Sequence, residues 1–130
     1  MLADFGALSS WAGNVDHSCL ITEDRSGVGI KRRVQMGRST LVETVIGWSP
    51  PAELSYEVHG LPKVIRRVVN TWRIQSTGRT TVVTLTSDVD AGHRPLQKLI
   101  AKIAGRKLGS ASDEMLDGLA KNMSVRENLI

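Results

Sequence analysis

The chain has 130 residues, 41% of them hydrophobic and 23% charged, which are ordinary values for a globular domain with a core of its own. No apolar run approaches the roughly 20 residues that span a bilayer, and the start "MLADFGALSSW" lacks the basic segment that opens a secretory signal. The 17 basic and 13 acidic residues give a net charge of +4, which is only a weak argument for acidic partners and which we interpret as solvated faces of the fold.

One cysteine, Cys19, excludes an intramolecular disulfide. A chain without disulfides suits a reducing compartment, so we expect a cytoplasmic location. We also expect Cys19 to be a small buried residue. No linker, repeat or low-complexity tract divides the sequence, and we therefore predict one domain over residues 1–130.

The first half of the chain predicts short helices followed by strands. Leu2, Phe5 and Leu8 recur every three residues, which predicts a short helix over residues 2–11, with a second helical turn near 9–12. From Ser18 onward, alternation and β-branched residues predict six strands, over 18–24, 28–36, 39–48, 53–59, 65–76 and 79–89. Glycine- and proline-containing turns separate these strands, which favours an antiparallel meander.

After Gly92 the apolar period becomes helical and predicts a long C-terminal helix. Its apolar positions are Leu96, Leu99, Ile100, Ile103, Leu108, Met115, Leu119 and Met123. Gly105 and Gly109 each cost about 1 kcal/mol relative to alanine, and Ser112 suits an N-cap. We therefore expect the helix to kink or break near residues 105–112.

The turn at Gly37-Arg38 predicts the register of one hairpin. Glycine at the first central position favours a two-residue type II′ turn, which places Arg32 directly opposite Glu43. The same face also carries Ile30, Val34, Leu41 and Val45. Because a buried charge is costly unless it is paired, we predict that Arg32 and Glu43 form an ion pair inside the fold.

A second hairpin is predicted at Thr77-Gly78, where Ser76 would pair with Arg79. The inner-face pairs would then be Val68 with Ser87, Asn70 with Leu85, Trp72 with Val83, and Ile74 with Thr81. Tyr56 alternates with solvent-facing neighbours and points inward.

Five polar side chains thus fall on the inner face: Arg32, Glu43, Tyr56, Asn70 and Arg66. A solid core would hold one or two, so this number favours a mostly apolar cavity in which a few polar groups orient a ligand. The alternative, that helix packing and water satisfy all five, stays open.

Five segments, "LADFGALSSW", "GVGIKRRV", "LVETV", "PPAELSYEV" and "LDGLAKNM", resemble the START-like SRPBCC superfamily, specifically its bacterial polyketide cyclase/dehydrase-like members. The resemblance covers nearly the whole chain. It implies an α+β helix-grip fold, in which a curved antiparallel sheet of about six strands grips a long C-terminal helix beside short N-terminal helices. It also implies a hydrophobic cavity between the sheet and the helix.

Carried over from the family, the pattern's arginine, glutamate and tyrosine fall on Arg32, Glu43 and Tyr56, and Trp11 matches the tryptophan that ends the short helices. The chain departs from the pattern by opening inside the first helix, without the family's first strand. This departure predicts an exposed sheet edge, which could support a dimer, or a natural start upstream of Met1.

The leading hypothesis is a binding module for a lipophilic small molecule such as a polyketide, a lipid or an aromatic metabolite. The expected ligand-binding residues are Arg32, Glu43, Tyr56, Asn70, Trp72 and Trp11. Arg32 would serve best with an acid or enolate oxygen, because charge-assisted hydrogen bonds are strong.

Two alternatives stay open. A cyclase or dehydratase would use Glu43 as general base, Arg32 to stabilise enolate charge and Tyr56 to position or donate a proton. However, Arg32 beside Glu43 should lower the pKa of that carboxyl and weaken it as a base. The other alternative is an interaction or regulatory protein whose pocket is incidental.

Other chemistries find little support. His17, His59 and His93 are scattered, so we expect no metal, and no motif indicates a cofactor. The basic strand residues divide between two faces and aromatic residues are few, so we expect no nucleic-acid partner. The basic helix segment 98–107 could touch a membrane, but we interpret it as the wet face of an amphipathic helix.

Overall fold

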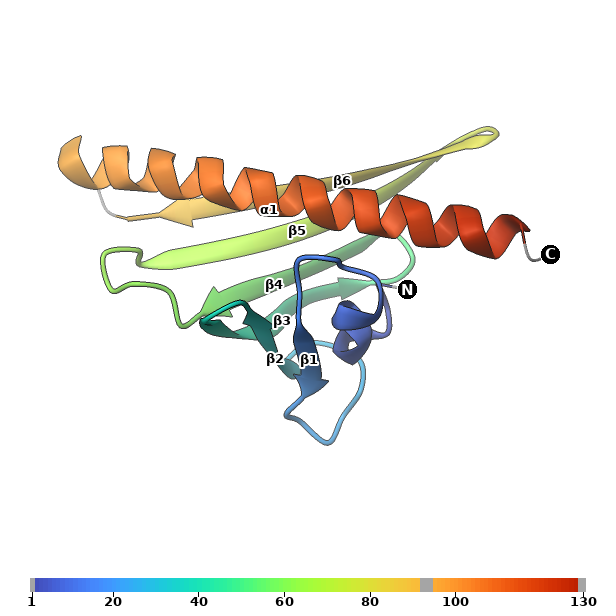
Figure 1. Ribbon diagram of the computed structural model, residues 1–130, viewed down its shortest axis with the longest axis horizontal. Helices are drawn as coiled ribbons and strands as arrows, with labels where there is room; N and C mark the ends of the chain where they lie inside the picture. Colours follow the sequence, from blue (N-terminus) through green and yellow to red (C-terminus); the bar gives the residue numbers. More distant parts are fainter. Residues whose placement is uncertain (1, 92–94, 129–130) are drawn as a thin grey trace.

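The computed structural model describes residues 2–91 and 95–128. The C-terminal helix is α1 (Pro95–Asn128), within which the side chains at 102, 103, 105, 106 and 109–123 are described. Six strands form one antiparallel sheet in chain order, and α1 lies along its last strand (Figure 1). The strands are β1 (His17–Leu20), β2 (Lys31–Met36), β3 (Ser39–Ser49), β4 (Glu53–His59), β5 (Arg67–Thr77) and β6 (Thr80–Asp90).

The N-terminal segment forms one short 3-10 helix, η1 (Phe5–Ser10), which is kinked at Ala7, in place of the two helical turns expected from sequence. Ser18 of β1 fastens it to the sheet. The Ser18 hydroxyl donates to the Gly6 carbonyl at 2.8 Å and accepts from the Ser9 amide at 2.8 Å. The helix therefore sits over the β1 end of the sheet (Figure 1).

The first hairpin has the predicted register. Gly37 takes a positive φ of 59°, and Arg32 pairs with Glu43 across β2 and β3. Further along β3, a bulge between Val45 and Gly47 shifts the alternation by one residue. Because of this shift, Trp48 faces the same side of the sheet as Glu43.

The predicted register of the second hairpin is wrong by two residues. The turn is Gly78-Arg79, with Gly78 at φ 67°, so the glycine occupies the first central position here as well. The observed inner-face pairs are Val68 with Val89, Asn70 with Ser87, Trp72 with Leu85, and Ile74 with Val83. A shift of two keeps every side chain on its predicted face.

The break expected near residues 105–112 is also wrong, because α1 is one continuous helix. Gly105 and Gly109 have open space beside them, so only their propensity cost of about 1 kcal/mol each opposes the helix. Gly118 has a positive role. A β-carbon there would collide with the Trp11 carbonyl oxygen, so glycine permits the helix to approach the N-terminal segment closely.

The helix turns Met115 and Leu119 into the core and leaves Ile103 and Met123 half exposed. The predicted apolar positions Leu96, Leu99, Ile100 and Leu108 lie outside the described side chains. A hydrogen bond also connects α1 to the N-terminal segment, because Asn14 Nδ2 donates to the Ala111 carbonyl at 3.2 Å.

Two expectations about burial are wrong. Cys19 is exposed, because Leu20 beside it takes the inner face of β1 and alternation turns the thiol outward. Arg66 is exposed and precedes β5, and its backbone amide donates to the Asp90 carbonyl at 2.7 Å. Within the described residues, no helix combines the length and apolarity that a membrane crossing requires.

Candidate functional site

Arg32 and Glu43 form a buried ion pair on the inner face of β2 and β3. The register places them opposite each other, and Arg32 Nε lies 2.5 Å from Glu43 Oε2 with both side chains 4% exposed. Arg32 Nη1 also donates to the Phe5 carbonyl at 2.8 Å. The guanidinium carbon lies 3.8 Å from the centroid of the Phe5 ring, so the charge is satisfied by an acid, a carbonyl and an aromatic face.

Tyr56 lies beside this pair and is fully buried. Its ring centroid is 4.9 Å from the Arg32 guanidinium carbon, and its hydroxyl accepts a hydrogen bond from Trp72 Nε1 at 3.3 Å. Burial raises the pKa of Tyr56, and the nearby Glu43 carboxylate raises it further, against the opposing effect of Arg32. Tyr56 is therefore a neutral phenol throughout the physiological range.

Trp11 and Asn70 complete the predicted set. The Trp11 ring meets the Trp72 ring edge-on, with centroids 5.9 Å apart. Asn70 is buried opposite Tyr56 on the neighbouring strand, and its Oδ1 accepts from the Ser87 hydroxyl at 2.6 Å. The structure thus places five of the six predicted residues on the inner face of the sheet and packs the sixth, Trp11, against Trp72, and their part in ligand binding stays a prediction.

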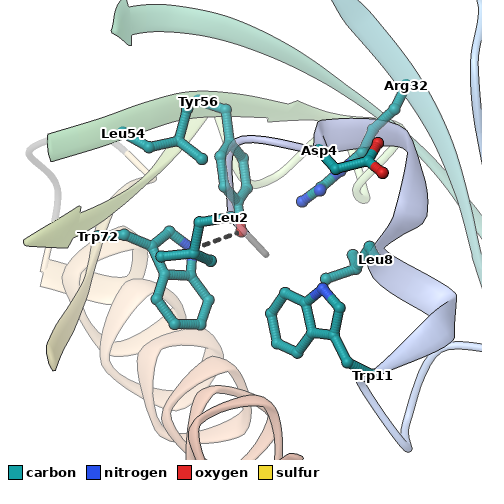
Figure 2. Close-up of a pocket in the computed structure, with 8 residues that line it drawn as sticks. All are labelled: Leu2, Asp4, Leu8, Trp11, Arg32, Leu54, Tyr56 and Trp72. Carbon is teal, nitrogen blue, oxygen red and sulfur yellow. Dashed lines mark hydrogen bonds between the residues drawn. The ribbon is translucent and has the colours of Figure 1, made fainter. Parts of the chain in front are cut away.

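The space next to these residues is narrow. We call it the inner pocket, and it is lined by Leu2, Asp4, Leu8, Trp11, Arg32, Leu54, Tyr56 and Trp72 (Figure 2). The described structure leaves no room in it for a water-sized molecule. The hollow expected at the ion pair is filled because η1 packs Phe5 and Leu8 onto this part of the sheet.

The large hollow lies further along, and we call it the outer cleft. It has a volume of about 850 Å³ between the β3–β6 end of the sheet and the C-terminal half of α1. Its apolar wall includes Trp48, Trp72, Ile74, Val83, Leu116 and Met123. Charged residues at its border are Glu53, Arg79 and Asp117, the first of which pairs with Arg73 at 3.0 Å.

Among the six predicted site residues, only Trp72 lines the outer cleft. Arg32, Tyr56 and Trp11 line the inner pocket, while Glu43 and Asn70 line neither. Sequence reasoning missed Val83 and Met123. The available signal was the apolar inner face of the β5–β6 hairpin, which continues past Trp72 to Ile74 and Val83.

Comparison with known protein families identifies the family of the chain. The family model described as "Polyketide cyclase / dehydrase and lipid transport" matches residues 1–124. None of the curated proteins compared with the chain matches it. The family match covers both the inner pocket and the outer cleft.

Proposed function

This chain belongs to the polyketide cyclase/dehydrase and lipid transport family, and from that premise we propose that it binds a lipophilic small molecule in the outer cleft. The observation that carries the proposal is the cleft itself. Its volume of about 850 Å³ falls within the range of about 300–1,000 Å³ that is typical of small-molecule sites. Two tryptophans and several aliphatic side chains supply the apolar wall that such a ligand needs.

The hydrophobic effect supplies most of the affinity. Each Å² of apolar surface removed from water contributes roughly 25 cal/mol, so a ligand gains by covering Ile74, Val83 and Leu116. Met123 is half exposed on α1 and has a flexible side chain that adapts to ligand shape. The charged residues stand at the border, where they remain solvated.

Binding without turnover is the function that the geometry supports best. A general base must come within about 3 Å of the proton that it removes. Glu43 faces Arg32, and it lines neither the outer cleft nor the inner pocket. Catalysis by Glu43 stays a prediction, which loss of turnover of a polyketide mimic in Glu43→Gln would support.

Two matched variants test the proposal with the neutral dye Nile red. Thr81 lines the cleft from β6, so Thr81→Trp should place an indole ring in part of the cleft and weaken dye binding about tenfold. Val82 is the next residue on the same strand, is 46% exposed and does not line the cleft. Val82→Trp should therefore bind the dye like the unmodified protein.

Fluorescence titration measures both affinities. Equal weakening in the two variants would place the dye elsewhere, and the absence of saturable binding to the unmodified protein would refute the proposal. Native mass spectrometry of protein purified from its own host provides a second readout, since a retained lipophilic molecule should be lost in Thr81→Trp.

A further inference from the structure

We propose that Trp11 recognises a neutral carbonyl oxygen on the ligand through its indole N–H, in the inner pocket that Leu2 closes in this structure. This inference rests on the proposed function, because it concerns the polar end of the molecule whose apolar body occupies the outer cleft. Three observations support it: an unsatisfied donor, a shared wall between the two spaces, and the charge around the inner pocket.

The first observation is the unsatisfied donor. Trp11 is 7% exposed, and its Nε1 finds no hydrogen-bond acceptor among the described residues. Buried polar groups are almost always hydrogen-bonded, and a buried unpaired donor costs free energy. The neighbouring indole N–H, that of Trp72, is hydrogen-bonded because it donates to the Tyr56 hydroxyl.

The second observation is that the two spaces share a wall. Leu2, Leu54 and Trp72 line both the inner pocket and the outer cleft. Figure 2 shows Leu2 in front of Tyr56 and Trp72, on the opposite side of the pocket from Trp11. Leu2 precedes η1 and is only half buried, whereas Leu54 and Trp72 are fixed in the sheet. Of these three side chains, Leu2 is therefore the one best placed to move and join the two spaces.

The third observation is the charge around the inner pocket. The Arg32 charge is neutralised by Glu43, and the exposed Asp4 carboxylate adds a negative charge at the solvent side of the lining. An anionic oxygen would meet this extra negative charge. A neutral carbonyl oxygen avoids that repulsion and still accepts a hydrogen bond from Trp11 Nε1. The ligand class is thus an apolar molecule that carries a ketone, an ester or an amide carbonyl.

Three naphthalenes of similar size test the inference: acetylnaphthalene, ethylnaphthalene, in which a methylene replaces the carbonyl, and naphthoate. Indole N–H signals of Trp11, Trp48 and Trp72 are followed by two-dimensional NMR, with Trp11→Phe identifying the first. Acetylnaphthalene should move the Trp11 proton downfield, while the other two compounds should not. Trp11→Phe should weaken acetylnaphthalene about tenfold relative to ethylnaphthalene, because only the ketone loses a hydrogen bond.

A second variant separates recognition from packing. Leu2→Ala should strengthen acetylnaphthalene binding relative to ethylnaphthalene binding, because it opens the inner pocket to the carbonyl while both compounds lose the same apolar contact in the outer cleft. Equal weakening of both compounds in Leu2→Ala, or in Trp11→Phe, would overturn the inference. So would a Trp11 shift of the same size with naphthoate.

The result also distinguishes this inference from the proposed function. If acetylnaphthalene shifts Trp48, which lines the outer cleft, without moving Trp11, the carbonyl site is refuted and binding in the cleft is supported. If no naphthalene binds and Nile red does not bind either, both proposals fail.

Discussion

Removal of the Glu43 charge should destabilise the protein far more than removal of a surface charge. In Glu43→Gln the Arg32 guanidinium stays charged inside the fold with no carboxylate beside it. Breaking a buried pair in this way typically costs about 3–5 kcal/mol. We expect a value near the lower end, because Arg32 keeps the Phe5 carbonyl and the Phe5 ring as partners.

Urea unfolding followed by tryptophan fluorescence measures this loss, because Trp11 and Trp72 are buried. With a slope of about 2 kcal/mol per molar urea, a loss of about 3 kcal/mol lowers the midpoint by roughly 1.5 M. The control is Glu57→Gln, which breaks the partly exposed pair of Arg67 and Glu57 at 3.6 Å and should cost less than about 1 kcal/mol.

The reasoning is refuted if Glu43→Gln costs no more than Glu57→Gln at an unchanged slope. The double variant Arg32→Met with Glu43→Leu tests the cause. Because it removes both charges, it should be more stable than Glu43→Gln alone. A double variant at least as unstable as Glu43→Gln would show that lost packing, and not an unpaired charge, explains the effect.

Three further predictions concern single residues. Because burial raises the pKa of Tyr56, its contribution to stability is fully present below about pH 10 and is lost as the pH rises above that value. Urea unfolding at several pH values measures this loss, which should be smaller in Tyr56→Phe. Gly118→Ala should lower the free energy of unfolding by about 1–3 kcal/mol, because its β-carbon meets the Trp11 carbonyl. Gly105→Ala should raise the free energy of unfolding by about 1 kcal/mol. An equal rise in the melting temperature of the two variants would disprove the close contact at Gly118. Cys19 should react with Ellman's reagent in the folded state, and a thiol that reacts only after addition of urea would contradict its exposure.

The hairpin around Gly37 could be predicted from sequence because two signals agree. The glycine fixes the turn, and a slip by one residue would bury Lys31 without an acid opposite. At Gly78 the two candidate turns differ by two in register and place the same side chains inside. The hydrophobic pattern therefore could not choose between them, and the glycine's position in the turn decides.

The position of the hollow could not be predicted, because it depends on which side chains fill the space. Arg32 and Tyr56 were correctly placed inside by alternation. The filling of the adjacent space depends on η1 folding back so that Phe5 stacks on Arg32, a contact between residues 27 positions apart. Periodicity describes which face a residue takes, but not what approaches that face from elsewhere in the chain.

The last strand of the sheet affects how the protein behaves in solution. β6 has a strand on one side only within the described residues, and no charged residue occurs between Arg79 and Asp88. Charged side chains are a common means by which proteins prevent such strands from pairing with other molecules. We therefore expect concentration-dependent self-association, visible in sedimentation velocity, which a lysine substituted for the exposed Thr84 should suppress.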